Sequence, residues 1–142
     1  MIKPKLIDHI VLRTDRYREL IAFYCDVLGC VLERETADEL GLTQLRAGDS
    51  LIDIVNVDGE LGKAGGPSPG EEGHNVDHFC LQIEPVGEEA LKAYLQENGV
   101  EVEDFQDRFG AQGLGRSIYL KDIAGNIVEL RNVVNQLNRF SQ

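Results

Sequence analysis

One strand pattern occurs twice in this chain, and each copy opens with the dipeptide Asp-His. The first copy, residues 8–12, reads DHIVL, and the second, residues 77–81, reads DHFCL. Because side chains along a strand point alternately to opposite faces, His9 and His78 each lie on the face opposite the apolar residue that follows them. Two strands of one design predict two copies of one folding module.

The segments that follow these two strands also repeat. Residues 15–28 and 87–98 each carry an apolar stripe at helical spacing, and each is followed by a glycine, Gly29 or Gly99, suited to end a helix. Asp15 is the expected N-cap of the first helix. Three short strands are then predicted in each half, at residues 30–35, 42–46 and 51–57, and at residues 100–105, 116–121 and 127–132. The order is strand–helix–strand–strand–strand in both halves.

This order predicts an α+β fold made of two βαβββ modules. Module 1 spans about residues 6–57 and module 2 about residues 76–132, within a single domain of 142 residues. The connecting residues 58–75 hold six glycines and two prolines, which favours a flexible crossover over an active-site lid. Residues 108–115 are expected to form a glycine-rich loop. The C-terminal tail, residues 133–142, is expected to carry a short docked helix.

Charge and composition exclude several classes of partner. Nucleic acid and anionic membranes are bound through a broad basic surface, and the formal net charge of −11 argues against such a surface here. No apolar run approaches the roughly 20 residues that a membrane span requires, and no apolar segment typical of a secretory signal is visible. The odd number of cysteines (Cys25, Cys30 and Cys80) is interpreted as buried, reduced thiols in a cytoplasmic protein.

Two carboxylates occupy equivalent places in the last strand of each module. Asp53 lies in LIDIV and Glu129 in IVELR, each with its apolar neighbours on the opposite face. Burial of a carboxylate among apolar strand residues is costly unless it is paired or binds a metal. His9, Asp53, His78 and Glu129 share the face of the sheets away from the helices. This constellation predicts a site for one divalent metal with mixed nitrogen and oxygen ligands, suited to Fe, Mn, Co, Ni or Zn.

Other roles for these residues stay open at this stage. A strand histidine can simply be packed or hydrogen-bonded, and the carboxylates could pair with Arg13 or Arg131. The matched positions in both halves favour the metal. His74, in the linker, lies outside the repeat and is expected in solvent. Asp8 and Asp77 should point away from the site by alternation and act as local hydrogen-bond acceptors.

Four segments together resemble the vicinal oxygen chelate superfamily, which includes glyoxalase I, bleomycin-resistance proteins and extradiol dioxygenases. They are DHIVL at residues 8–12, FYCDVLGC at 23–30, DHFCL at 77–81 and, most specifically, IYLKDIAGNIVEL at 118–130. The resemblance implies two βαβββ modules whose sheets form an open, cup-like barrel around a metal. The ligand positions of the family match His9, Asp53, His78 and Glu129. Metal-dependent glyoxalases carry Glu at the position of Asp53, so the shorter aspartate is expected as an optional fourth ligand.

The resemblance also implies a chemistry. In that family the metal chelates two adjacent oxygens of a small substrate and, as a Lewis acid, stabilises an enediolate or a similar oxyanion. Glu129 is then the first candidate for the general base and Asp53 the second. Arg13, Gln82 and Arg131 lie on the cup side by parity and could hold an anionic part of the substrate, or the arginines could be counter-ions of the carboxylates. Tyr119 is also expected to face the cup.

The function expected is that of a divalent-metal-dependent, glyoxalase-like lyase or isomerase. It would act on a small molecule with vicinal oxygens. An Fe(II) extradiol ring-cleaving dioxygenase is the alternative enzyme, and a metal-free, drug- or metabolite-sequestering protein of the bleomycin-resistance type is the alternative outside catalysis. The edges that such sheets leave open predict a homodimer.

Overall fold

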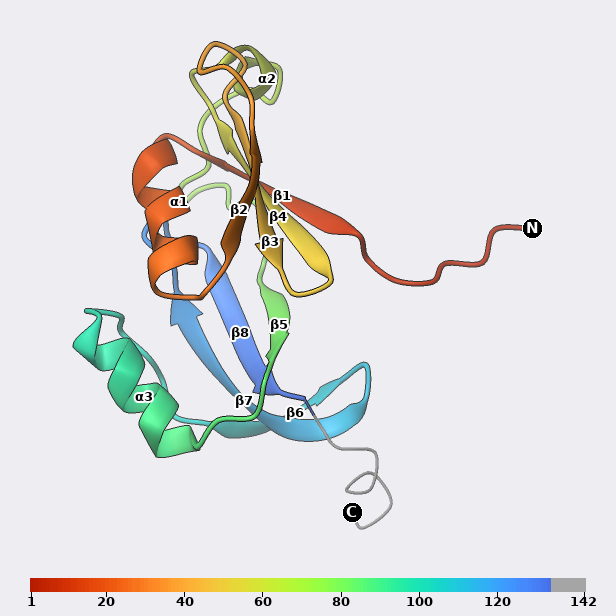
Figure 1. Cartoon of the computed structure of the whole chain (residues 1–142), viewed down its shortest axis with the longest axis vertical. Coiled ribbons are helices and arrows are strands. Elements are labelled where there is room, and N and C mark those ends of the chain that lie inside the picture. The colour runs from red at the N-terminus through yellow and green to blue at the C-terminus, as the bar shows by residue number, and fades with distance from the viewer. Residues whose placement is uncertain (134–142) are drawn as a thin grey trace. The chain divides into compact units, whose positions relative to one another are not determined.

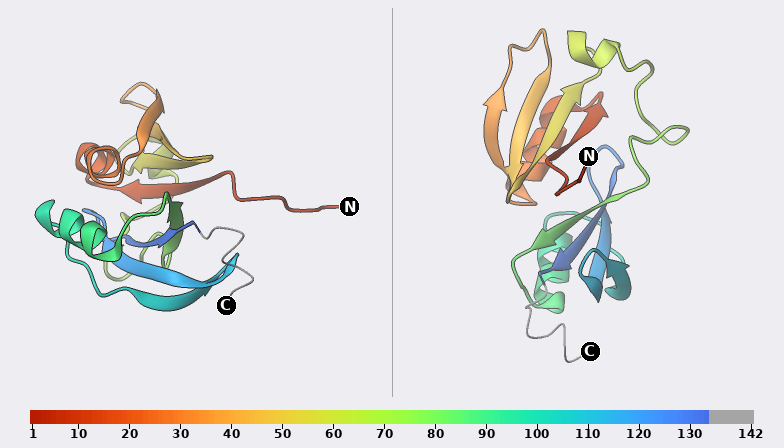
Figure 2. Two further views of the ribbon diagram at one scale, coloured as in Figure 1. Left: turned by 60° about the horizontal axis from the view of Figure 1, so that its bottom comes forward. Right: turned by 90° about the vertical axis from the view of Figure 1, so that its right-hand side faces the viewer.

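The fold consists of two compact units that repeat one plan. In the computed structural model, described for residues 1–133, the first unit is Met1–Asn75 and the second begins at Val76. Each unit is a four-stranded mixed sheet with one long helix along one face (Figures 1 and 2). The described residues contain no helix both long and apolar enough to cross a membrane.

Unit 1 contains the first βαβββ module. Its elements are β1 (His9–Thr14), α1 (Tyr17–Asp26), β2 (Val31–Glu35), β3 (Leu42–Ala47) and β4 (Ser50–Asn56). The strand order is β1-β4-β3-β2, with β1 parallel to β4 and the other pairs antiparallel. The parallel pair forms because the chain crosses over through α1 and returns through two hairpins.

The core of unit 1 lies between α1 and its sheet. Leu20 and Tyr24, four residues apart on α1, are fully buried, as are Leu12 and Ile54 on β1 and β4. The N-cap is Arg16, one residue later than the expected Asp15, and the hydroxyl of Thr14 accepts a hydrogen bond from the backbone N–H of Arg16. Gly29, with φ of 76°, ends the helical segment in the left-handed conformation.

Unit 2 contains the second module. Its elements are β5 (Phe79–Ile83), α3 (Glu88–Glu97), β6 (Gln106–Gly110), β7 (Gly113–Lys121) and β8 (Ile127–Asn132). The strand order β5-β8-β7-β6 is the counterpart of that in unit 1, again with one parallel pair, β5 and β8. Leu91 and Leu95 of α3 and Ile118 and Val128 of the sheet fill its core. The predicted α+β fold of two βαβββ modules is confirmed.

Two expectations in unit 2 are wrong. Residues 100–105 form no strand beyond an isolated bridge between Val102 and Leu120. Residues 108–115, expected as a loop, belong instead to the β6–β7 hairpin, whose Gly110 and Gly113 pair across the turn. Gly110 and Gly115 are not loop residues. A Cβ at either would lie 1.8 or 2.4 Å from a guanidinium nitrogen of Arg131, so they are small because Arg131 fills the space above them.

The glycine-rich connection between the modules was expected to be flexible, but it is hydrogen-bonded to Arg13 of β1. It contains the short helix α2 (Glu60–Lys63), and the Arg13 guanidinium donates hydrogen bonds to the carbonyl oxygens of Gly62, Gly66 and Pro67. The side chain of Asn75 pairs with both backbone groups of Arg13, at 3.1 and 2.9 Å. Arg13 thus anchors the connection and forms no ion pair with a described carboxylate. The helix expected in the tail lies outside the described residues.

Gly62 offers a test of how α2 packs against the end of β4. A Cβ there would lie 1.9 Å from the carbonyl oxygen of Asn56, so Gly62→Ala should lower the free energy of unfolding by about 2 kcal/mol through overpacking. Gly70→Ala is the matched control, because a Cβ at Gly70 meets nothing within 4 Å, and it should change stability by less than about 0.5 kcal/mol. Urea denaturation measures both. Equal stability of the two variants would contradict this packing.

Candidate functional site

Unit 1 places a buried carboxylate in the middle of its sheet. Asp53 lies on β4, is 5% exposed, and sits between Val11 of β1 and Gln44 of β3 in the strand register. Gln44 Nε2 donates a hydrogen bond of 3.2 Å to Asp53 Oδ2. The other oxygen, Oδ1, is buried and has no hydrogen-bond partner among the described residues. A buried, unsatisfied carboxylate oxygen calls for a cation or a donor that these residues do not supply.

His9 lies on the same face of unit 1, at the start of β1. Its Nδ1 is 2.7 Å from Asp8 Oδ1. The hydrogen bond to Asp8, followed by the negative charge of Asp53, raises the pKa of His9 above its ordinary value. Because Nδ1 is bound to Asp8, Nε2 is the ring nitrogen that is available to bind a metal. Metal-binding histidines commonly donate their other ring N–H to a carboxylate in this way.

Unit 2 repeats the arrangement more tightly. His78 Nδ1 is 2.6 Å from Asp77 Oδ2, and His78 Nε2 is 3.5 Å from Glu129 Oε1. Glu129 is 5% exposed. Two donor atoms that each lie about 2.1 Å from one tetrahedral ion are about 3.4 Å apart. The His78–Glu129 separation therefore suits two ligands of one ion, and equally an ion pair if the histidine is protonated.

The two half-sites are equivalent in strand register. Asp53 pairs with Val11, two residues after His9, and Glu129 pairs with Cys80, two residues after His78. Asp8 and Asp77 are local hydrogen-bond acceptors, as expected, but they do not point away from the site, because each binds Nδ1 of the histidine that follows it. Asp77 also lines the same pocket as His78. The repeated Asp-His dipeptide is thus a repeated hydrogen-bonded pair.

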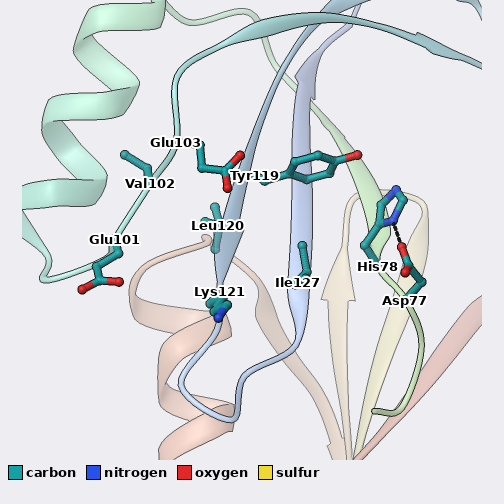
Figure 3. A pocket seen from close by; sticks show the side chains of 9 residues that line it. All are labelled: Asp77, His78, Glu101, Val102, Glu103, Tyr119, Leu120, Lys121 and Ile127. Carbon is teal, nitrogen blue, oxygen red and sulfur yellow. Dashed lines mark hydrogen bonds and ion pairs between the residues drawn. The ribbon is translucent and has the colours of Figure 1, made fainter. Parts of the chain in front are cut away.

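A pocket of about 410 Å³ opens on the polar face of unit 2. Figure 3 shows His78 and Tyr119 at one side of it, with Asp77 bound to the histidine. The two rings meet edge to face, with centroids 5.2 Å apart. Desolvation, and then the nearby Glu129, raises the pKa of Tyr119, so its phenol stays protonated at neutral pH.

Arg108 joins this cluster, and the sequence did not single it out. Its guanidinium carbon lies 4.0 Å from the centroid of the Tyr119 ring, and its Nη1 donates to the carbonyl and the hydroxyl of Ser117. It was missed because residues 108–115 were taken for a loop. The alternation of Ser117, Gly115 and Gly113 on β7, continued across the hairpin, would have placed Arg108 on the polar face.

The other residues expected to bind substrate lie in different surroundings. Gln82 and Arg131 are register partners on the polar face of unit 2, and Gln82 Nε2 donates to Gln112 Oε1 at 2.7 Å. The guanidinium of Arg13 donates its hydrogen bonds to carbonyl oxygens of the linker. Cys80 is exposed, contrary to the expectation of buried thiols, whereas Cys30 is buried and Cys25 half-buried. Desolvation, together with the nearby Glu129, raises the pKa of the Cys80 thiol to about 12. Cys80 is therefore not a thiolate nucleophile at neutral pH.

The structure therefore brings the candidate ligands together as pairs within each unit. Within residues 1–133, no three His, Cys, Asp or Glu side chains gather in one cluster that could hold a metal. Unit 1 supplies His9 with Asp53, and unit 2 supplies His78 with Glu129. His74 is exposed in the linker. The two half-sites and the repeated βαβββ plan define a class of small, internally duplicated α+β proteins with a polar sheet face.

Comparison with known families names that class. The model of the Glyoxalase/Bleomycin resistance protein/Dioxygenase superfamily matches residues 6–130. The chain belongs to this superfamily. The match spans both modules and includes all four candidate ligands.

Solved structures agree with this assignment. A virulence protein from Salmonella typhimurium is 28% identical, with a TM-score of 0.74 over 94% of this chain and 100% of that chain. An integron cassette protein from the mobile metagenome of V. cholerae is 24% identical, with a TM-score of 0.75 over 94% and 99% of the two chains. A lactoylglutathione lyase from Agrobacterium tumefaciens is 23% identical, with a TM-score of 0.64 over 91% and 94%. The last two likenesses show the fold alone.

The Asp8–His9 pair gives a measurable pKa. Asp8→Asn removes the negative charge but keeps an oxygen acceptor, so the pKa of His9 should fall toward its ordinary value of about 6.5. At a given pH, less of the histidine would then be protonated. Titration of the His9 ring by NMR, in protein freed of metal by chelator, measures the shift. Asp15→Asn is the control and should leave it unchanged, whereas an unaltered His9 pKa in Asp8→Asn would contradict the role of Asp8.

Proposed function

We propose that this protein is a divalent-metal-dependent enzyme of the glyoxalase-like type. Its substrate would be a small molecule with two adjacent oxygens, and its reaction that of a lyase or isomerase. The observation that carries the proposal is the repeated half-site, in which an aspartate-anchored histidine accompanies a buried carboxylate at an equivalent strand position in both modules.

The chemistry of the donor set supports a metal. In both histidines Nδ1 is bound to a carboxylate, which fixes the ring and leaves Nε2 as the ligand atom. The unsatisfied Oδ1 of Asp53 is explained if a cation binds there. We assign His9, His78 and Glu129 as ligands and Asp53 as the optional fourth. Imidazole and carboxylate together suit Fe, Mn, Co, Ni or Zn.

The bound ion would supply Lewis acidity that polarises the two substrate oxygens. The side chains of the chain would do the rest. Glu129 is the first candidate to take the proton from carbon, with Asp53 the second. The phenol of Tyr119, beside His78, can donate a hydrogen bond to an oxygen on which negative charge develops. Gln82 and Arg131, on the same face, are placed to contact the remainder of the substrate.

Two other functions compete with this one. An Fe(II) ring-cleaving dioxygenase would use the same ligands on a catechol. A metal-free protein that sequesters a small molecule is the alternative outside catalysis, and it would need no ion at either half-site. In that case the 3.5 Å contact between His78 and Glu129 would be an ordinary ion pair. Metal content separates the sequestering protein from the two metal enzymes. A screen of hemithioacetals and catechols on metal-loaded protein separates the glyoxalase-like enzyme from the dioxygenase.

Metal content per chain is the decisive measurement. Wild-type protein should hold one divalent ion, and His78→Ala should lose it, since the exposed Cys80 lies two residues along the strand and cannot replace the imidazole at the same height. Asp53→Ala should weaken binding much less if water can fill the fourth position. His74→Ala, at an exposed histidine of the linker, is the control and should keep the metal.

Elemental analysis of the purified variants, before and after metal loading, provides the result. Equal metal in wild type and His78→Ala would end the metal assignment. Absence of metal from every loaded sample would favour the sequestering protein. Circular dichroism should show that all variants keep the fold, because the half-sites lie on the polar sheet faces and not in the helix-covered cores.

We also propose a homodimer. The edges of the two sheets, such as β2 with its exposed Val31 and Leu32, would otherwise remain open to pairing. Light scattering at micromolar concentration should therefore give twice the chain mass of 15.8 kDa. A monomer mass under these conditions would reject the dimer.

A further inference from the structure

We propose that Arg131 and Arg108 form a subsite for an anionic group of the substrate on the polar face of unit 2. The group would be a carboxylate or a phosphate, both of which guanidinium recognises through charge-assisted hydrogen bonds. This inference rests on the proposed function, since it names the chemical class of the substrate at the same site. It also adds Arg108 to the site.

The first observation is a buried guanidinium without a carboxylate. Arg131 is 6% exposed. Its Nη2 donates to the carbonyl oxygens of Arg108 and Gly113, both at 3.2 Å, and within the described part of the chain its Nε and Nη1 make no hydrogen bond. Burial of a cation costs several kcal/mol unless opposite charge and full hydrogen bonding offset it. Two carbonyl oxygens satisfy one nitrogen, and the N–H groups of the other two nitrogens, which are not sealed from solvent, are accessible to an anion.

The second observation is the floor on which Arg131 lies. A Cβ on Gly110 would be 1.8 Å from its Nη1, and a Cβ on Gly115 would be 2.4 Å from its Nη2. Two glycines on facing strands therefore let the guanidinium lie against the backbone of the β6–β7 hairpin. Glycine weakens a strand interior, so the sequence gives up strand stability where this cation lies.

The third observation is a second cation on the same face. Arg108 lies above β7, where it stacks on Tyr119 and donates to Ser117. Neither Arg108 nor Arg131 has an ion-pair partner within 4.0 Å among residues 1–133, although the chain carries a net charge of −11. Ion pairs with carboxylates are formed by Arg16, Arg18, Arg46 and Arg116, whereas Arg13 and Arg34 of unit 1 donate to neutral oxygens instead. Two guanidinium groups that share one sheet face, each with no described carboxylate within 4.0 Å, favour the binding of an anion although Glu129 lies further along β8.

The position of this pair relative to Glu129 limits the size of the substrate. Arg131 follows Glu129 by two residues on the same face of β8, which corresponds to about 7 Å along the strand. A substrate whose reacting carbon lies beside Glu129 would therefore carry its charged group only a few bonds away. Gln82 and Gln112, hydrogen-bonded to each other beside Arg131, supply amide groups at the rim. A small hydroxy or keto acid, or a small sugar phosphate, fits this description.

The test measures anion binding to the full-length protein after removal of metal with a chelator. The probes are acetate and inorganic phosphate, with acetamide as the uncharged control, and the readout is the NMR signals of the arginine Nε–H groups. Arg108 and Arg131 should show saturable shifts with at least one anion and none with acetamide. The probe that binds more tightly identifies the charged group as carboxylate or phosphate.

Arg108→Gln is the main variant, because it removes the charge from a half-buried side chain without emptying the floor of the site. It should weaken anion binding by roughly tenfold or more. Arg131→Lys, which keeps the charge but loses the planar fork, should weaken it as well. Arg34→Gln, at an exposed arginine of unit 1, is the matched control and should bind as the wild type does.

The outcomes separate this inference from the proposed function. Absence of a saturable shift with either anion, or unchanged affinity in a folded Arg108→Gln, would overturn the anion subsite. The metal content of Arg108→Gln should equal that of the wild type, because the substitution leaves all four proposed ligands in place. A chain that binds the anion but never a metal would overturn the proposed metal enzyme and leave the subsite standing.

Discussion

The cost of burying charge in the middle of a sheet governs the polar faces of this protein. Asp53 and Glu129 are each 5% exposed on central strands. A carboxylate in that position must be neutralised, hydrogen-bonded or bound to a cation. Gln44 serves one oxygen of Asp53, and His78 approaches one oxygen of Glu129. The helix-covered faces meet no such demand, since they are filled by aliphatic and aromatic side chains.

Because the βαβββ plan is duplicated, both buried carboxylates have a histidine at the same place relative to them. The crossover through a helix makes the first and last strands of each module parallel neighbours, which sets the histidine near the carboxylate in both halves. The aspartate before each histidine then fixes its ring. One local sequence, Asp-His at a strand start, therefore serves twice, and the superfamily assignment over residues 6–130 covers both uses.

The two half-sites differ in what surrounds them. In unit 1 the carboxylate is the shorter aspartate and its polar neighbour is the neutral Gln44. In unit 2 the longer Glu129 lies 3.5 Å from His78 and close to Tyr119, on which Arg108 is stacked, and Arg131 follows two residues later on the same face. A buried carboxylate, a phenol and two guanidinium groups thus belong to one unit. This asymmetry places most of the proposed substrate chemistry on unit 2, whereas the role proposed for unit 1 is to supply two of the ligands.

The sequence by itself determined the parts of this protein that depend on local periodicity. Alternation and helical spacing were enough to find both modules, the strands that carry His9, Asp53 and Glu129, the strand that begins just after His78, and the glycines that end the helices. Tertiary structure decided the rest, because it depends on contacts between residues distant in sequence. Gly110 and Gly115 looked like loop residues until Arg131, on another strand, was seen to occupy the space of their side chains. Arg13 looked like a counter-ion until its guanidinium was found on the linker carbonyls. A strand pattern gives the face on which a side chain begins, but the partner that its charged end reaches is set by the packed fold.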